Sequence, residues 1–434
     1  AQELREKPEP ILLECLTFRM RGHEEASGTK YVPQALLDEW AARDPVTNFE
    51  HYLVQQGLLR EDAKQAMRAA IKSEMEAGLQ KAFGEADIAP EPERELADVY
   101  APNQAPAIRP AGDKSTERRF VDAVSESLRQ AMEKHDRLVL MGQDIGEYGG
   151  VFKITQGFVE QFGAERVRNT PLCESAIIGI GLGLSLRGYK SMVEMQFADF
   201  VSCGFNQIVN NLAKLHYRWG QAADVVIRMP TGAGVGAGPF HSQSNEAWFT
   251  HTPGLKVVYP ATPRDAKGLL LAAFQDPNPV LFFEHKALYR SLSDAVPDDY
   301  YTLPIGQARL AQEGDQLSVI TYGMGVHWAE KICDELGVSA DIVDLRSLLP
   351  LDYAAIDRSV QKTNKAIVLH EDTLFGGLGG ELAAYIGEHL FEHLDGPVRR
   401  VASLDTPVPF SRALEQQFLP VDRFRKAVQQ LLAY

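Results

Sequence analysis

The chain has 434 residues, of which 45% are hydrophobic and 24% are charged, and its formal net charge is −15. This length can hold two or three domains with large cores. The acidic balance disfavours contact with phosphate backbones, so we expect no nucleic-acid partner. The apolar stretch Ala176–Leu186 is too short to span a bilayer, and we expect no membrane association. The four scattered cysteines fit free thiols in a reducing compartment.

The first 95 residues predict one strand followed by mainly helical structure. Pro10–Phe18 has the apolar character of a buried strand, and because a domain rarely starts inside a strand, we expect further sequence before it. Glu61–Gly84 is rich in residues that favour helices. Residues 96–114, which are rich in proline and alanine, are expected to be a semi-extended linker.

Residues 115–300 and 301–434 each alternate short apolar strands with helices, beginning with an amphipathic helix over Thr116–His135. This alternation predicts parallel sheets covered on both faces. The expected fold is therefore α/β, with two parallel-sheet domains behind a mainly helical leader. The predicted strands are Leu138–Met141, Ser191–Met195, Asp224–Met229, Lys256–Tyr259 and Val280–Glu284, then Leu317–Tyr322, Asp341–Leu345, Ala366–Leu369 and Arg399–Ser403.

Glu174 is a lone carboxylate at the start of an apolar, glycine-bearing helix. One interpretation is a first-turn acid stabilised by the helix dipole. The other is a functional acid buried beside Cys173, Ile177 and Ile178, where desolvation would keep it able to donate a proton.

Gln196, Phe197 and Phe200 follow the predicted strand Ser191–Met195, at the edge where open α/β sheets bind ligands. Both aromatic rings could instead be ordinary core residues.

His241 ends a glycine-dense segment that follows another predicted strand. This segment does not match a dinucleotide fingerprint, because Pro239 intervenes where a helix should begin. A loop that brings His241 into a cleft and a merely structural histidine are both compatible with the pattern.

Arg19 and His23 follow the predicted strand at the front of the chain, in a segment that could clamp phosphate oxygens or form a solvated basic turn. His389, Glu392 and His393 match the H-x-x-E-H pattern of inverted zinc peptidases. We treat that match as a coincidence, because no third ligand accompanies it, and we predict no metal ligands in this chain.

Several longer segments of the sequence resemble a known enzyme family. TPLCESAIIGIGLG, EMQFADF, VDLRSLLPLD and HEDTLFGGLGGEL resemble the β subunit of the thiamine diphosphate-dependent 2-oxo acid dehydrogenases, within the transketolase-like enzymes. PILLECLTFRMRGHEEASGTKYVPQALLDEWAARDPV resembles the end of the α subunit of the same enzymes. The order of α tail, linker and β half therefore resembles a fused single-chain enzyme whose front part is absent. The implied domains are residues 1–95 (α tail), 96–114 (linker), 115–300 (pyrimidine-binding) and 301–434 (transketolase C-terminal-like).

The resemblance implies roles for individual residues. Glu174 would hydrogen-bond the aminopyrimidine ring of thiamine diphosphate, Phe200 would line the pyrimidine pocket, and Gln196 would lie near the reacting centre. His241 would assist acyl transfer to a lipoyl group. Arg19 and His23 match the positions of the α tail that face the cofactor diphosphate and the substrate.

Two departures from the family pattern bear on the site. The family binds Mg²⁺ and the diphosphate through a G-D-G motif followed by paired asparagines in its α half. No G-D-G occurs here, and Asn210 and Asn211 form a pair in a different context. The metal ligands are therefore expected in the missing α portion. Glu24 stands where animal relatives carry a phosphorylated serine, so we expect no kinase control there.

The motifs QFADF, FHSQS and FFEHKALYR are more similar to those of branched-chain than of pyruvate dehydrogenases. We therefore expect a branched-chain 2-oxo acid as substrate. The alternatives are a pyruvate or acetoin dehydrogenase of the same family and a non-catalytic assembly subunit. The implied partners are an α-subunit-like portion and the lipoyl-bearing acyltransferase core, in a homodimer or an α2β2-like assembly. The implied location is the cytoplasm of a bacterium or the mitochondrial matrix of a eukaryote.

Overall fold

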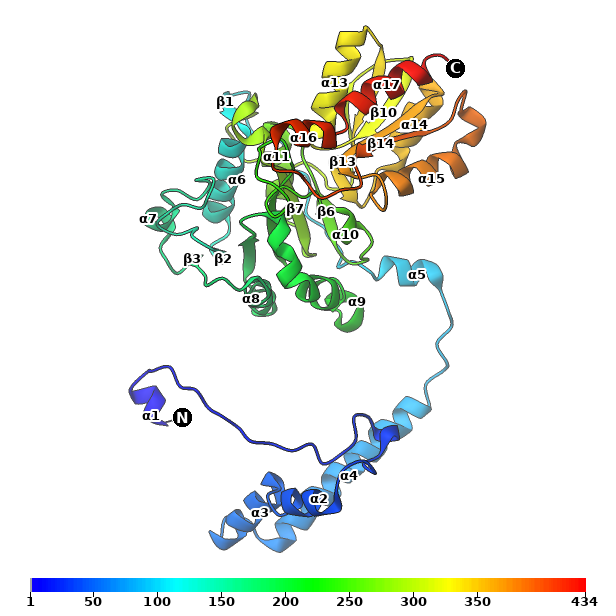
Figure 1. Ribbon diagram of the computed structural model, residues 1–434. Coiled ribbons are helices and arrows are strands. Elements are labelled where there is room, and N and C mark those ends of the chain that lie inside the picture. The colour runs from blue at the N-terminus through cyan, green and yellow to red at the C-terminus, as the bar shows by residue number, and fades with distance from the viewer. Residues whose placement is uncertain (1) are drawn as a thin grey trace. The chain divides into compact units, whose positions relative to one another are not determined.

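The computed structural model describes residues 2–434, and it divides into two compact units, one ending at Pro90 and one running from Glu91 to Tyr434. Figure 1 shows the helices of the first unit in blue; in the second unit, strands β2 to β7 run from teal to green, and the strands labelled β10, β13 and β14 from yellow to orange. No helix among residues 2–434 is long and apolar enough to cross a membrane.

The first unit is helical. Asp44 begins one of its helices by accepting a hydrogen bond from the Thr47 amide at 2.7 Å, with Pro45 in the first turn. None of its α-helices contains a buried residue. Its helices are α1 (Gln2–Glu6), η1 (Glu25–Ser27), α2 (Gln34–Ala41), α3 (Pro45–Gln55) and α4 (Glu61–Phe83).

The strand predicted over Pro10–Phe18 is wrong. These residues have no regular secondary structure, and all except Phe18 are exposed. A strand needs a neighbour for its amides and carbonyls. No segment among residues 2–90 forms a strand, so this unit offers Pro10–Phe18 no strand with which to pair.

The second unit contains two α/β domains, which confirms the predicted parallel-sheet fold. The first domain has a seven-stranded sheet in the order β12-β6-β7-β5-β4-β2-β3. All neighbours in it are parallel except β12 and β6. Its strands are β2 (Leu138–Gly142), β3 (Val167–Asn169), β4 (Lys190–Glu194), β5 (Val225–Thr231), β6 (Lys256–Val258), β7 (Val280–His285) and β12 (Ser347–Leu349).

Helices and short helical turns cover this sheet. The predicted helix over Thr116–His135 begins later than expected, because Ser115–Arg119 forms β1, which pairs antiparallel with β8. Helix α6 then packs against α11, whose first turn is capped by the Thr262 hydroxyl. The remaining elements are α6 (Phe120–Lys134), α7 (Phe158–Phe162), α8 (Glu174–Leu186), η2 (Ala198–Gly204), η3 (Gln207–Leu212), α9 (Leu215–Trp219), α10 (Ala247–Thr250), α11 (Pro263–Ala273), α12 (Leu288–Ser291) and β8 (Ser293–Pro297).

The second domain has a five-stranded sheet in the order β14-β13-β10-β11-β9, in which only β9 runs antiparallel to its neighbour. Its strand β12 crosses over and completes the seven-stranded sheet, where it pairs with β6. Its elements are β9 (Arg309–Gln312), β10 (Leu317–Thr321), α13 (Met324–Leu336), β11 (Ala340–Asp344), α14 (Tyr353–Thr363), β13 (Ala366–Thr373), α15 (Gly379–His389), η4 (Phe391–His393), β14 (Arg399–Ser403), α16 (Arg412–Phe418) and α17 (Val421–Leu431).

The expected linker, residues 96–114, is fastened to the seven-stranded domain. After α5 (Pro92–Ala97), the Ala101 amide donates to Asn278 Oδ1 at 2.8 Å and the Ile108 amide donates to Thr302 Oγ1 at 2.8 Å. Because these bonds satisfy the polar backbone of an otherwise irregular segment, the segment follows the surface of the domain.

Candidate active site

The predicted functional residues of the second unit lie beyond the carboxyl ends of neighbouring parallel strands. Gln196 follows β4 and the loop that carries His241 follows β5, while Gln143, which was not predicted, follows β2. The strands β2, β4 and β5 are adjacent and parallel, so their carboxyl ends form one edge of the sheet. Ligands of open α/β sheets bind at that edge.

Glu174 is the first residue of α8. Its Oε1 accepts a hydrogen bond of 3.0 Å from Gln143 Nε2, and no other described residue bonds the carboxylate. The expected burial of Glu174 is wrong: its side chain is partly exposed and Cys173 is exposed, while only Ile177 and Ile178 are buried. The start of α8 therefore lies at the surface of this unit, while Ile177 and Ile178 in its first two turns are buried.

Gln196 contacts the two residues that directly follow β2, one of which also bonds Glu174. Its Nε2 donates to Asp144 Oδ2 at 3.1 Å and lies 3.5 Å from the Gln143 carbonyl oxygen. The residues after β2 therefore connect Glu174 with Gln196. The structure thus brings these two predicted residues to one side of the sheet edge.

His241 is enclosed by aromatic rings. Its ring centroid lies 4.7 Å from that of Phe197 and 5.5 Å from that of Phe200, both in edge-to-face geometry. Phe197 and Phe200 also contact each other edge to face at 5.7 Å. Phe197, Phe200 and His241 therefore form a cluster of three rings in mutual contact, and all three are only partly buried.

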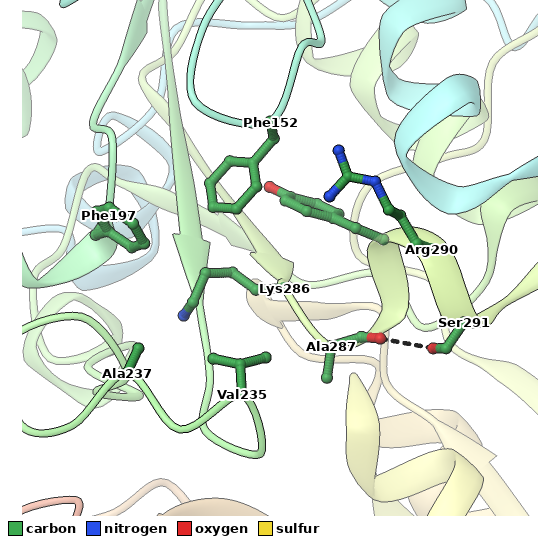
Figure 2. Close-up of a pocket in the computed structure, with 9 residues that line it drawn as sticks. Phe152, Phe197, Val235, Ala237, Lys286, Ala287, Arg290 and Ser291 are labelled. Carbon is green, nitrogen blue, oxygen red and sulfur yellow. Dashed lines mark hydrogen bonds between the residues drawn. The ribbon is translucent and has the colours of Figure 1, made fainter. Parts of the chain in front are cut away.

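A cavity of about 560 Å³ is lined in part by Phe197. Figure 2 shows the aromatic rings of Phe152 and Phe197 on one side and the small side chains of Val235 and Ala237 on another. The remaining lining residues are Lys286, Ala287, Tyr289, Arg290 and Ser291.

Lys286 is the buried cation of this cavity. Its Nζ donates to the Gly232 carbonyl oxygen at 2.7 Å and lies 5.7 Å from the centre of the Phe197 ring. Burial lowers the pKa of Lys286 to about 8, although Asp199 and Glu371 act in the opposite direction. The ammonium group therefore loses its proton more readily than an exposed lysine does.

A buried ion cluster lies within the central strands. Arg228 on β5 donates to Glu194 on β4 at 2.5 Å and to both carboxylate oxygens of Glu284 on β7, at 2.7 and 2.6 Å. Tyr289 donates its hydroxyl to Glu284 at 2.7 Å. The Arg228 side chain is fully buried, so its charge is balanced by these carboxylates alone.

Two other predicted residues belong to the first unit. Arg19 and His23 are both exposed there. In the H-x-x-E-H match, His389 ends α15, while Glu392 and His393 lie in η4. Residues 2–434 contain no group of three or more His, Cys, Asp or Glu side chains that could hold a metal ion.

Sequence reasoning missed several residues of the site. Gln143 and Asp144 connect Glu174 with Gln196, yet they come directly after a strand that showed no motif. Lys286 was part of the quoted segment FFEHKALYR, and Glu371 was part of HEDTLFGGLGGEL, but neither received a role. A search for charged residues at the ends of predicted strands would have found both.

Three family descriptions match consecutive parts of the chain. Residues 1–93 match "Dehydrogenase E1 component", residues 117–291 match "Transketolase, pyrimidine binding domain", and residues 306–423 match "Transketolase, C-terminal domain". Among solved structures, "Split gene transketolase, inactive beta4 tetramer" is similar with a TM-score of 0.59 and 23% identity, covering 74% of this chain and 99% of that one. That likeness supports the fold.

Curated relatives are more similar in sequence. The "2-oxoisovalerate dehydrogenase subunit beta" of Bacillus subtilis (strain 168) is 45% identical over 324 residues, which cover 73% of this chain and 98% of the relative. The corresponding mitochondrial "subunit beta 2" of Arabidopsis thaliana is 44% identical, over 66% of this chain and 82% of the relative. The "Pyruvate dehydrogenase E1 component subunit beta" of Bacillus subtilis (strain 168) is 42% identical, over 69% and 94%.

Proposed function

Because the chain belongs to the β-subunit family of the thiamine diphosphate-dependent 2-oxo acid dehydrogenases, we propose that it acts in the oxidative decarboxylation of a branched-chain 2-oxo acid and in transfer of the acyl group to a lipoyl group. The observation that carries this proposal is the gathering of Glu174, Gln196, Phe200 and His241 at one edge of the sheet. The branched-chain substrate is favoured by the names of the relatives at 45% and 44% identity.

The donor and acceptor atoms around Glu174 fit an aminopyrimidine ring. Glu174 Oε2 has no partner among the described residues, and Gln143 Oε1 is buried without a hydrogen bond. An aminopyrimidine offers ring nitrogens and an amino group, so it can use both oxygens. When bound, thiamine diphosphate supplies the electron sink for the loss of carbon dioxide, and the protein supplies orientation and proton control.

Each residue then has a defined task. Glu174 holds a proton at the pyrimidine ring nitrogen, and Gln143 orients the Glu174 carboxylate. Phe200 lines the pyrimidine pocket, and Gln196 lies near the reacting centre. His241 gives a proton to the departing sulfur of the lipoyl group or stabilises charge that develops there.

The complete site requires an α-subunit-like portion. We assign the ligands of Mg²⁺ and most of the diphosphate contacts to that portion, and we assign Arg19 and His23 of the first unit to the diphosphate and substrate side. The enzyme would assemble as a homodimer or an α2β2-like particle on a lipoyl-bearing acyltransferase core, in a bacterial cytoplasm or a mitochondrial matrix. The retention of both Glu174 and His241 speaks against a purely structural assembly subunit.

The substrate assignment is tested by comparing 2-oxo acids in the complete enzyme with thiamine diphosphate and Mg²⁺. We expect kcat/KM for 3-methyl-2-oxobutanoate to exceed that for pyruvate by about tenfold or more, because each extra methyl group in a fitted apolar pocket adds about 1–3 kcal/mol. A preference for pyruvate would contradict the branched-chain assignment and leave the family intact. Failure with every 2-oxo acid tested would contradict the catalytic role.

A further inference from the structure

The loop between β5 and His241 has an unusual backbone. Four of its residues, Gly232, Gly234, Gly236 and Gly238, have φ values of 92°, 87°, 71° and 72°. These glycines alternate with residues that do not have a positive φ, so the backbone alternates between left-handed and ordinary conformations along the loop. Alternation of this kind turns successive amide N–H groups toward a common concave side, which is a geometry that binds anions.

A carboxylate from the other domain occupies this concave backbone. Glu415 on α16 accepts hydrogen bonds from the Gly234 amide at 2.8 Å and from the Gly236 amide at 3.2 Å through Oε1 and 3.1 Å through Oε2. Glu415 is only 4% exposed, and no described lysine, arginine or histidine lies within ion-pair distance of it. The amides of the loop therefore satisfy the buried charge.

A second carboxylate bonds the start of the same loop and a residue that lies just beyond His241. Glu371 on β13 accepts from the Ala233 amide at 2.6 Å and from the Ser244 hydroxyl at 3.2 Å. Its other oxygen lies 2.6 Å from His285 Nε2 on β7. Burial would raise the pKa of Glu371, but His285 and the Ala233 amide outweigh burial and lower it.

The held loop shapes the site on both sides. Val235 and Ala237 line the cavity of Figure 2, and His241 follows at the end of the loop against Phe197. At Gly238 the backbone passes so close to Phe410 that a Cβ atom would lie 2.4 Å from the ring. The five-stranded domain therefore fixes this loop by hydrogen bonds at its start and by close packing near its end.

We propose that Glu415 and Glu371 are positioning residues: through the backbone of residues 232–238 they hold the cavity wall and His241 in place for the transfer to the lipoyl group. The effect on that transfer rests on the function proposed for His241. The hold on the loop itself does not depend on it.

The test uses Glu415→Gln and Glu415→Ala, with Gln416→Ala as the matched control on the exposed side of the same helix. Hydrogen exchange is measured on the full chain. We expect exchange in residues 232–241 to become at least tenfold faster in Glu415→Ala and less so in Glu415→Gln, which keeps one acceptor oxygen. The control should leave the exchange unchanged. Unchanged exchange in both Glu415 variants would overturn the proposal.

The same variants are assayed in the complete enzyme for lipoyl reduction and, with an artificial electron acceptor, for decarboxylation. We expect Glu415→Gln to slow lipoyl reduction about tenfold and decarboxylation by less than threefold. Equal losses in both assays would overturn the positioning role, because a general loss of folded enzyme lowers both. If Glu415→Ala does not fold, Glu371→Gln gives the same comparison.

Failure of the two proposals can be told apart. Faster loop exchange in the Glu415 variants together with normal lipoyl reduction in His241→Ala would contradict the function proposed for His241. The same result would support the positioning of the loop by Glu415. Slow lipoyl reduction in His241→Ala together with unchanged loop exchange in the Glu415 variants would overturn the positioning role of Glu415 and support the function proposed for His241.

Discussion

The two sheets of the second unit are built alike but differ in what lies beyond their strands. Beyond β2, β4 and β5 of the seven-stranded sheet lie Glu174 with its Gln143 partner, Gln196 and the His241 loop. The five-stranded sheet and its neighbouring helix α16 instead contribute carboxylates that bind backbone amides. Under the proposed function, similar architecture would therefore place the reactive groups in one domain and their support in the other. Changes at the strand ends of the first domain should alter chemistry most, whereas changes at its buried ion cluster or in the second domain should alter stability or loop order.

Glu174→Gln should give the largest effect. A neutral amide cannot hold and return the proton that the pyrimidine ring requires, so decarboxylation should fall by about a hundredfold to ten-thousandfold. The measurement is steady-state decarboxylation by the complete enzyme, with unfolding curves to show that the fold survives. Glu160→Gln, an exposed glutamate of α7, is the control. Turnover within a few-fold of the unaltered enzyme would remove Glu174 from the mechanism.

Arg228→Met tests whether the buried ion cluster belongs to stability and not to chemistry. Removing the cation leaves Glu194 and Glu284 buried without a counter-charge, which should cost about 3–5 kcal/mol in the free energy of unfolding. Denaturant unfolding measures the loss, and the exposed Arg358→Met is the control. Adding Glu194→Gln and Glu284→Gln should recover part of the loss. A variant as stable as the unaltered chain would show that the cluster is not a stabilising unit.

His241→Ala should slow lipoyl reduction by about a hundredfold, the usual loss for one general acid or charge stabiliser. Decarboxylation with an artificial electron acceptor should change less, since that assay bypasses the lipoyl group. The exposed His51→Ala serves as the control. Equal losses in the two assays would place His241 earlier in the reaction, and no loss in either would make it a structural residue.

His370→Leu should give the smallest effect, in the five-stranded domain. Burial lowers the pKa of His370 to about 4. Its ring lies nearly parallel to that of Tyr322, with the ring centroids 6.4 Å apart. The unfolded chain takes up a proton on this histidine near pH 6.5 and the folded chain only near pH 4, so folding stability falls as the pH drops through that window. The variant should lose about 1–2 kcal/mol less than the unaltered chain between pH 7 and pH 5. Denaturant unfolding at pH 7 and pH 5 measures this. If the variant and the unaltered chain lose the same free energy of unfolding between these two pH values, the prediction is contradicted.

The parallel-sheet fold could be predicted because buried strands contain continuous apolar runs, such as Val280–Phe283 in β7, and alternate with helices. The short ribbon of β1 and β8 could not, since Ser115–Arg119 is polar and exposed and is a strand only because it pairs with residues far along the chain. Pro10–Phe18 shows the reverse error: an apolar run alone does not make a strand without a neighbour.

The shared position of Gln196, Phe200 and His241 at one sheet edge could be predicted, because a motif and a strand end coincide there. The positions of Glu371 and Glu415 were not, because they reach the loop from another domain, more than a hundred residues away in sequence. The expected burial of Glu174 failed for a related reason. Sequence neighbours such as Ile177 and Ile178 are buried beneath the helix, whereas its first residue lies at the surface.

Strand β12 has a consequence for how the second unit opens. It belongs by sequence to the five-stranded domain, yet its hydrogen bonds complete the seven-stranded sheet at β6. Separation of the two domains would remove one edge strand from the seven-stranded sheet and expose the edge of β6 that now pairs with β12, while β6 would stay paired with β7. The two domains therefore form one cooperative block, and a hinge motion between them would require partial unfolding. Hydrogen exchange in β6 and β12 should consequently report the opening of the whole block.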